Sequence, residues 1–211
     1  NAGQVCCASK RVLVQKSIAE EYTNRLINAL KLLKVCEPHE KECDMGPLVS
    51  EQAACEVENK VNQTIKQGAR CVFGGKRYNK TYFEPTVLKD VTADMDIAKD
   101  MEIFGPVVPI IEFEENDEAI KIANQTKYGL SGGVIGRDIK AALSTALKLE
   151  SGTTVVNGCG DYRTLYTPFG GHKMSGIGTE GLMLTLEEMM LTKCVALKGI
   201  VEESVSESVL R

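Results

Sequence analysis

Hydrophobic residues recur along the chain with two different spacings, which predicts strands separated by helices. Arg11 to Gln15 is short and β-branched, which favours a strand, and apolar residues then repeat at helical spacing from Ile18 to Leu33. A second helical repeat runs from Val57 to Gly68 and ends on a glycine, after which Cys71 to Phe73 is strand-like. The first third of the chain therefore predicts two helices, each next to a short strand.

The later part of the chain alternates more regularly. Valine-rich or isoleucine-rich strands are predicted over Pro85 to Leu88 and Val107 to Phe113. The next predicted elements are a helix over Asp117 to Gln125, a strand over Leu130 to Ile135, a helix over Ile139 to Leu149 capped by Asp138, and a strand over Thr153 to Asn157. Helices between strands imply parallel pairing with right-handed crossovers. We therefore predict an α/β fold with a mostly parallel sheet flanked by helices.

The last part of the chain does not continue the alternation of strands and helices. A helix is predicted from Glu180 to Met190, and the strand-like run Leu191 to Leu197 has no later helix to cover it, so we expect it to pair elsewhere. Gly199 to Arg211 is polar and acidic. We predict a main unit over residues 1–190, a late strand over 191–198 and an acidic tail over 199–211.

Composition narrows the class of protein. The 211 residues carry a formal charge of -4 without a basic stripe, and 5% are aromatic, so nucleic acid is not expected as a partner. No apolar run approaches the length of a membrane span, and no export signal is visible, so we expect a cytoplasmic protein. The eight cysteines form no C-x-x-C pair, and His39 and His172 lie far apart, so free thiols without a metal site are predicted.

The chain opens with Asn-Ala-Gly-Gln-Val-Cys-Cys, which places Cys6 and Cys7 in a turn. A reactive cysteine needs a partly open, donor-rich turn of this kind. Adjacent thiols cannot face the same way, so Cys6 is predicted to face a cleft while its neighbour fills the core. The alternative is that both are buried small hydrophobic residues, which is the commoner fate of a free cysteine.

Gly176-Ile-Gly-Thr-Glu-Gly181 matches the dinucleotide fingerprint G-x-G-x-x-G. That fingerprint requires a strand leading into its first glycine and a complete βαβ unit. Here a glycine-rich loop, Pro168 to Ser175, precedes it. We interpret these glycines as turns that allow close backbone approach.

Asn1 to Cys6 has the pattern N-x-G-Q-x-C, Glu102 to Val107 has the pattern E-x-F-G-P-V, and Pro168 to Gly176 has the pattern P-F-G-G-x-K-x-S-G. These three segments resemble motifs of the catalytic domain of the aldehyde dehydrogenase superfamily. Three shorter segments stand between these motifs in the order found in that family: Gly46-Pro47-Leu48, Gly74-Gly75 and Glu84-Pro85-Thr86. One departure is Thr179, which stands where the family usually has arginine before the glutamate.

The resemblance implies a mechanism. Cys6 would attack an aldehyde carbon to form a thiohemiacetal, whose oxyanion the backbone N–H of Cys6 helps to hold, and a thioester would then be hydrolysed to the acid. Glu102 would bind the ribose of NAD or NADP, and Phe104 would pack near the nicotinamide. The alternatives are a solvated acid at Glu102 and a core aromatic at Phe104. Because the family's cofactor domain, asparagine and water-activating glutamate precede the cysteine motif, we expect this chain to be a fragment that is inactive by itself.

The resemblance also places the substrate-entry loop at Gly158 to Tyr166 and makes Phe169 part of the pocket wall. Arg163 is the only cation in that loop, and a guanidinium suits a carboxylate. The hypothesis is a small acidic or hydroxylated aldehyde, such as succinate semialdehyde or lactaldehyde. The alternative is a surface arginine.

Two other classes of function compete with this hypothesis. A thiol esterase would need a histidine base beside Cys6, and neither His39 nor His172 stands in an orienting motif. A non-catalytic assembly module would use Leu191 to Leu197 to pair with another chain. The family uses a late strand for assembly, so a homo-oligomer, either a dimer or a tetramer, is expected for the complete enzyme.

Overall fold

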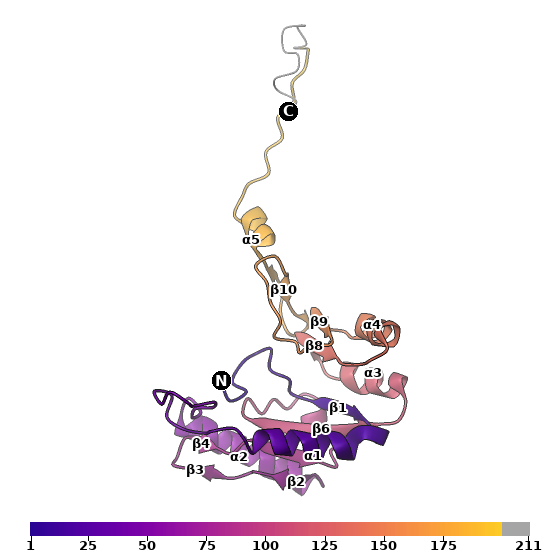
Figure 1. Cartoon of the computed structure of the whole chain (residues 1–211). Helices are drawn as coiled ribbons and strands as arrows, with labels where there is room; N and C mark the ends of the chain where they lie inside the picture. Colours follow the sequence, from indigo (N-terminus) through magenta and orange to yellow (C-terminus); the bar gives the residue numbers. More distant parts are fainter. Residues whose placement is uncertain (200–211) are drawn as a thin grey trace.

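Strand β6 (Val107–Phe113) runs through the interior of a four-stranded sheet with the order β1-β6-β5-β2. In this computed structural model, which describes residues 1–199, β1 (Val12–Gln15) and β5 (Thr86–Lys89) both run parallel to β6, and β2 (Arg70–Phe73) runs antiparallel to β5. Figure 1 shows this sheet at the base of the molecule, with a narrow arm leading away from it. The fold is α/β with a mostly parallel central sheet, as the sequence predicts.

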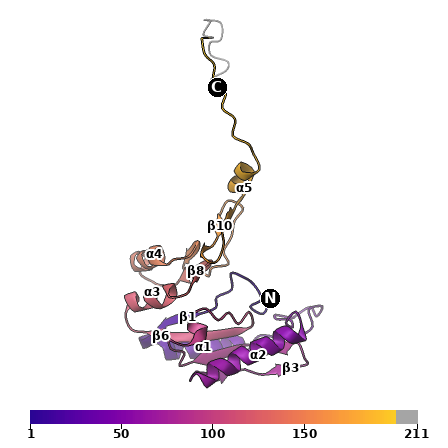
Figure 2. The ribbon, with the colours of Figure 1, turned by 180° about the vertical axis from the view of Figure 1, so that it is seen from behind.

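The alternation of side chains along β6 builds two cores. Val107 and Ile111 face helix α2 (Glu51–Lys66), whereas Ile110 faces helix α1 (Ala19–Leu30). Figures 1 and 2, seen from opposite sides, show the two helices on opposite faces of the sheet. Because each fully buried Leu, Ile or Val side chain contributes roughly 1.5–3 kcal/mol, these two layers dominate the stability of the body.

The helix ends differ from their predicted positions for local reasons. Helix α2 begins earlier than the apolar repeat, because Ser50 caps it by accepting a 3.1 Å hydrogen bond from the amide of Ala53. Its first turn is polar and carries no apolar signal. Helix α1 ends at Leu30, short of the predicted Leu33, and Leu32, just beyond its end, is 80% exposed.

The antiparallel pairing of β2 with β5 is the exception in a four-stranded sheet whose other strand pairs are parallel. The connecting residues form a short hairpin, β3 (Arg77–Tyr78) and β4 (Tyr82–Phe83), and contain no helix, so the chain reverses direction. Gly74 lies so close to the returning strand that an added Cβ would meet the carbonyl oxygen of Pro85 at 2.1 Å. This contact brings the Gly-Gly and Glu-Pro-Thr segments of the sequence together.

A second, smaller sheet follows helix α3 (Asn116–Asn124). Strands β8 (Ser131–Val134) and β9 (Thr153–Val156) pair in parallel, and helix α4 (Ile139–Lys148) packs against both. The sequence predicts all of these elements. Within residues 1–199, however, this pair is not hydrogen-bonded into the four-stranded sheet.

The arm, residues 161–199, contains no buried residue. It is attached through β7 (Tyr128–Gly129) pairing with β11 (His172–Lys173), and it continues through the β10 (Phe169–Gly170) and β12 (Thr179–Glu180) hairpin. Helix α5 is shorter than its predicted range and leaves its apolar residues exposed. Its bounds are Leu182–Glu188.

The late strand predicted over Leu191 to Leu197 forms no ladder with any other part of residues 1–199. A strand that pairs with another chain would have no partner inside its own chain, so the prediction of an assembly strand stays a prediction. Apart from Gly199, the predicted acidic tail lies outside the described residues. No helix within the described part of the chain is long and apolar enough to cross a bilayer.

Candidate active site

The first eight residues form two tight turns around Cys6. The amide of Gln4 donates to the carbonyl of Asn1 at 3.0 Å, and the amide of Ala8 donates to the carbonyl of Val5 at 3.1 Å. The side-chain amide of Gln4 also donates to the Asn1 carbonyl, at 3.1 Å. This cysteine loop, residues 1–8, is therefore held by its own polar groups, as the Asn and Gln of its motif allow.

The cysteine loop rests directly on the Glu102 to Val107 segment. Gly3 has a φ of 73°, and an added Cβ would meet the carbonyl oxygen of Gly105 at 2.2 Å. On another side, the side-chain oxygen of Gln4 accepts a 2.8 Å hydrogen bond from the amide of Val49, just after Gly46-Pro47-Leu48. Three segments that are distant in sequence, two of them quoted motifs, therefore meet at one loop.

Cys6 lies on the outside of this loop and is exposed, whereas Cys7 is half-buried. The two thiols thus have different surroundings, although Cys7 does not reach the buried core. Within residues 1–199 the backbone amide of Cys6 has no carbonyl acceptor, so this N–H is available for a ligand. An accessible sulfur and an available N–H on the same residue are what attack on a carbonyl group requires.

Lys10 joins Cys6 to Glu102. Its ammonium group donates to the Cys6 carbonyl at 2.8 Å and lies 2.7 Å from a carboxylate oxygen of Glu102. The backbone carbonyl of Glu102 also accepts a 2.7 Å hydrogen bond from Lys60. Sequence analysis did not single out Lys10 or Lys60. The position of Lys10, four residues after Cys6, is the one feature of the sequence that could have indicated its contact with the cysteine loop.

Phe104 is presented to the surface instead of being packed into the core. It has a φ of 57°, in the left-handed region that few non-glycine residues adopt, and its side chain is 43% exposed. The core-aromatic alternative for Phe104 is therefore wrong. Glu102 is also more than a solvated acid, because Lys10 neutralises it.

Two of the other thiols, those of Cys159 and Cys71, have features that disfavour attack. Cys159 is exposed but donates a 2.6 Å hydrogen bond to the carboxylate of Asp161, which raises the pKa of the Cys159 thiol. Burial raises the pKa of Cys71. Because the thiolate is the nucleophile, both residues are less reactive at neutral pH than an ordinary cysteine.

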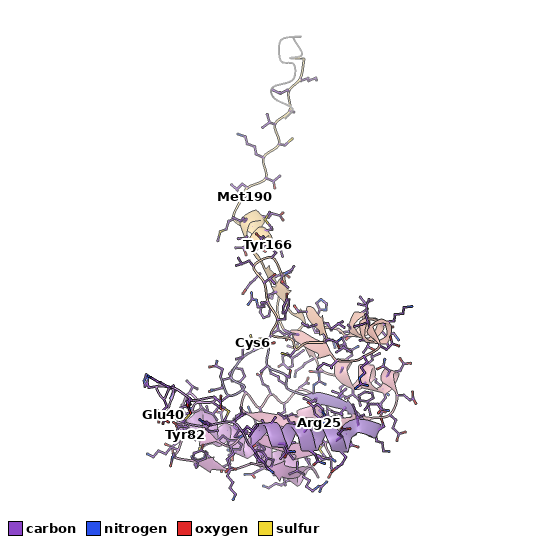
Figure 3. The ribbon with its side chains drawn as sticks, in the orientation of Figure 1. Cys6, Arg25, Glu40, Tyr82, Tyr166 and Met190 are labelled. Carbon is purple, nitrogen blue, oxygen red and sulfur yellow. The ribbon has the colours of Figure 1, made fainter. Side chains whose placement is uncertain are left out.

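Arg163 and Phe169 come together on the arm. The guanidinium carbon of Arg163 lies 4.1 Å from the centre of the Phe169 ring, and Glu180 lies 3.6 Å from the same guanidinium. No hydrogen bond or ion pair within residues 1–199 joins either residue to Cys6. Figure 3 places Tyr166, in the same loop, along the arm and Cys6 near its base. The structure thus groups the two predicted pocket residues with each other.

The last quoted motif anchors the arm. The ammonium group of Lys173 donates to the carbonyls of Asn124 and Thr126 at 2.7 and 2.9 Å, and the hydroxyl of Ser175 accepts a 2.9 Å hydrogen bond from the amide of Gly129. The G-x-G-x-x-G match that overlaps its end lies in turns and in β12, which pairs antiparallel with β10. No strand of a βαβ unit leads into Gly176, in agreement with the interpretation of these glycines as turns.

Neither histidine is positioned as a base for Cys6. His172 lies in β11, where its backbone pairs with Gly129, and His39 lies in the loop between α1 and α2. Across the described residues, no histidine side chain hydrogen-bonds to Cys6, and no group of three or more His, Cys, Asp or Glu residues is arranged to hold a metal ion. The arrangement supports covalent attack by sulfur, with backbone and lysine groups organising the loop.

Comparison with known proteins decides the family. A model described as the aldehyde dehydrogenase family matches residues 1–195. The chain belongs to the aldehyde dehydrogenase family. It is 39% identical over 200 residues to the lactaldehyde dehydrogenase of Methanococcus maripaludis, an alignment that covers 95% of this chain and 42% of that protein.

Two solved aldehyde dehydrogenase structures share the fold. The NADP complex of glyceraldehyde-3-phosphate dehydrogenase from Methanocaldococcus jannaschii has a TM-score of 0.84 and 41% identity, and covers 89% of this chain and 40% of that one. The succinate complex of an aldehyde dehydrogenase from Physcomitrella patens has a TM-score of 0.88 and 32% identity, with coverage of 94% and 41%. The chain therefore spans about two fifths of the length of these relatives.

Proposed function

We propose that this chain carries the catalytic cysteine of an NAD(P)-dependent aldehyde dehydrogenase, which oxidises a small aldehyde to the corresponding acid. The observation that supports this most strongly is the linked arrangement at the cysteine loop. Cys6 is exposed, and Lys10 contacts both its carbonyl at 2.8 Å and the Glu102 carboxylate at 2.7 Å. One side chain thus holds the nucleophile loop against the segment proposed to meet the cofactor.

The chemistry begins with the thiolate of Cys6. Its sulfur forms a bond to the aldehyde carbon, and the π electrons of the carbonyl move to the oxygen, which the available N–H of Cys6 stabilises. A bound nicotinamide supplies the hydride acceptor for the oxidation. The resulting thioester on Cys6 is attacked by water, and the sulfur leaves as a thiolate, which restores the cysteine.

Glu102 and Phe104 fit the cofactor role proposed for them. Both side chains are exposed and come from one short segment that lies on the cysteine loop. The carboxylate of Glu102 would accept hydrogen bonds from ribose hydroxyls in competition with Lys10, and the Phe104 ring would pack near the nicotinamide.

A Cys6→Ser substitution tests the proposal in the enzyme encoded by the gene that contains this chain. We expect turnover to fall by about a thousandfold or more, because serine is a far weaker nucleophile at neutral pH. The matched control is Cys7→Ser, which changes the adjacent half-buried thiol and should retain most activity. A Cys6→Ser enzyme with near-normal turnover would show that another group attacks the aldehyde.

We also propose that the 211-residue chain is inactive by itself. Among residues 1–199, Glu102 is the acidic side chain linked to the cysteine loop, and its carboxylate is held by the ammonium group of Lys10 at 2.7 Å instead of facing a water beside Cys6. Aldehyde and NAD(P) added to the purified chain should give no sustained formation of reduced cofactor. Multiple turnovers would refute this part of the proposal.

For the substrate, we propose a short acidic or hydroxylated aldehyde such as succinate semialdehyde or lactaldehyde. Two relatives support this class: one is named for lactaldehyde, and one was solved with succinate. Arg163 is exposed on the arm beside Phe169 and would exchange the carboxylate of Glu180 for that of a substrate. In the complete enzyme, Arg163→Met should raise KM for succinate semialdehyde far more than for an uncharged aldehyde of equal length. Equal effects on both would assign Arg163 to the surface.

We further propose that Leu191 to Leu197 pairs with a second copy of the protein to build a dimer or tetramer. The segment lies beyond α5, and its apolar side chains are exposed, with Leu191 98% and Leu197 79% accessible. Val195→Pro, which removes a backbone donor from this segment, should shift the complete enzyme toward monomer in sedimentation experiments. An unchanged mass would place the assembly contacts elsewhere.

A further inference from the structure

The loop between α1 and α2 contains two cysteines at the base of a closed turn. Two hydrogen bonds between Lys34 and Asp44 join the two ends of this loop. The amide of Lys34 donates to the Asp44 carboxylate at 2.8 Å, and the carbonyl of Lys34 accepts a 3.0 Å hydrogen bond from the amide of Asp44. Cys36 and Cys43 lie just inside these two ends. We call residues 34–45 the thiol loop.

The backbone of the thiol loop brings the two cysteines side by side. The amide of Cys36 donates to the Met45 carbonyl at 3.1 Å. The thiol of Cys43 lies 3.0 Å from the Cys36 carbonyl and 3.4 Å from that of Met45. The Cys43 sulfur therefore lies against the main chain of Cys36, and the two thiol groups are close enough to hydrogen-bond to each other.

The remainder of the loop is preorganised as well. Two successive turns, closed by the hydrogen bonds Glu40 N–H to Glu37 and Cys43 N–H to Glu40, lead from one cysteine to the other. The hydroxyl of Tyr82 donates to the Glu37 carboxylate at 2.7 Å, which ties the loop to strand β4. Figure 3 shows the labelled Glu40 and Tyr82 at this end of the molecule, away from Cys6.

We propose that Cys36 and Cys43 form a modification site that closes to an intrachain disulfide in exchange with a small disulfide such as glutathione disulfide. One protein thiolate attacks the small disulfide and releases one glutathione. The second protein thiol then attacks the mixed disulfide and releases the other. Two protein thiols are oxidised, one small disulfide is reduced, and the two thiol protons end on the two glutathione molecules.

The surroundings of Cys36 and Cys43 determine how fast their disulfide forms and how strongly it resists reduction. A hydrogen bond with the Cys43 thiol, together with burial and nearby carboxylates, raises the pKa of Cys36 to about 11. Closure should therefore be slow at neutral pH, because thiolate is scarce. Within residues 1–199 no hydrogen bond or ion pair joins a positively charged side chain to the Cys36 thiol, so the dithiol gains little over the neutral disulfide, and the bond once formed should be hard to reduce.

The experiment uses the reduced 211-residue chain exposed to glutathione disulfide, followed by alkylation of the remaining thiols and peptide mapping. Trypsin cleaves after Lys34, Lys41 and Lys60, so the disulfide joins two peptides, 35–41 and 42–60. The second peptide also contains Cys55, so Cys55→Ser and Cys43→Ser are compared. The cross-link should survive in the first variant and be absent from the second, in which Cys36 should keep a single glutathione.

Closure at pH 7 is slow in absolute terms, but because the two thiols are already held together we expect the 36–43 cross-link to form about tenfold faster than any other protein disulfide. Its rate should rise about tenfold per pH unit between roughly pH 7 and pH 9. The oxidised chain should melt about 5 °C higher, because the bond restricts the unfolded chain. Separate glutathione adducts on both cysteines without a cross-link would overturn the proposal, as would a cross-link that lowers the Tm. None of these readouts depends on dehydrogenase activity.

Discussion

The four-stranded body and the arm place similar side chains in opposite surroundings. In the body, Leu88 is 0% exposed and Ile111 1% exposed, whereas in the arm Leu186 is 45% exposed and Leu191 98% exposed. The difference lies in what surrounds them. The body has a helix on each face of its sheet, while the arm offers a short hairpin and one short helix.

This contrast separates the two halves of the proposed activity. The nucleophile loop is held by contacts within the body, such as Gly3 against Gly105. The residues proposed to select the substrate, Arg163 and Phe169, contact each other and Glu180 on the arm. The proposed nucleophile therefore lies on well-packed structure, whereas the residues proposed to select the substrate lie in a region whose apolar side chains are exposed.

The largest expected difference between the regions concerns leucines. Leu88→Ala empties a fully buried position and should lower the free energy of unfolding by about 3 kcal/mol. Leu186→Ala on α5 should lower it by less than about 0.5 kcal/mol, because the side chain is already partly in water. Urea titration of the purified chain measures both. Equal losses would mean that the arm is packed as firmly as the body.

A pair of glycines applies the same comparison to the backbone. Gly3→Ala forces a side chain into a positive φ and against the Gly105 carbonyl, and should cost about 2 kcal/mol. Gly178→Ala on the arm meets no atom within 4 Å and should be nearly neutral. If Gly3→Ala leaves the urea midpoint unchanged, the cysteine loop does not rest on Gly105.

The smallest effect concerns the junction between the two regions. Asp100 accepts hydrogen bonds from the Lys127 amide at 3.0 Å and the Thr126 hydroxyl at 2.9 Å, just before β7. The backbone hydrogen bond from Lys127, helped by Thr126 and the Lys127 charge, lowers the pKa of Asp100 in the folded chain. Its stabilising effect is thus complete above the unfolded pKa of about 3.9 and is lost as the pH falls through the folded value.

Asp100→Asn should therefore destabilise the chain at pH 7 by less than about 1 kcal/mol, and the difference from the parent should shrink below about pH 4. Unfolding by urea across this pH range provides the measurement. A difference that grows in acid would reverse the assigned sign.

Much of the body could be predicted because its signals are local. The alternation in β6 and the helical repeat of α1 both describe a face that becomes buried. The direction of β2 could not be predicted from periodicity, because it depends on the hairpin between Gly74 and Pro85. The polar first turn of α2 likewise depends on the Ser50 cap and carries no apolar repeat.

The motif residues of the candidate site could be identified from the sequence, but the contacts between them could not. The motifs identified Cys6, Glu102 and Phe104, and the structure brings their segments together through Gly3 and Gly105. Lys10 was missed because a lysine in a loop has no pattern of its own, and its role depends on a partner 92 residues further along the chain, at Glu102. Long-range pairing of this kind is visible only in three dimensions.

Competitive labelling of the eight thiols by a small alkylating reagent tests the central claim most directly. In the folded 211-residue chain at neutral pH, we expect Cys6 to react about tenfold faster than Cys7 and the other cysteines, because its sulfur is exposed on a donor-rich turn. Labelling in urea should remove this preference. If Cys6 reacts no faster than the rest in the folded chain, it is not displayed as a nucleophile, and the proposed active site would be contradicted.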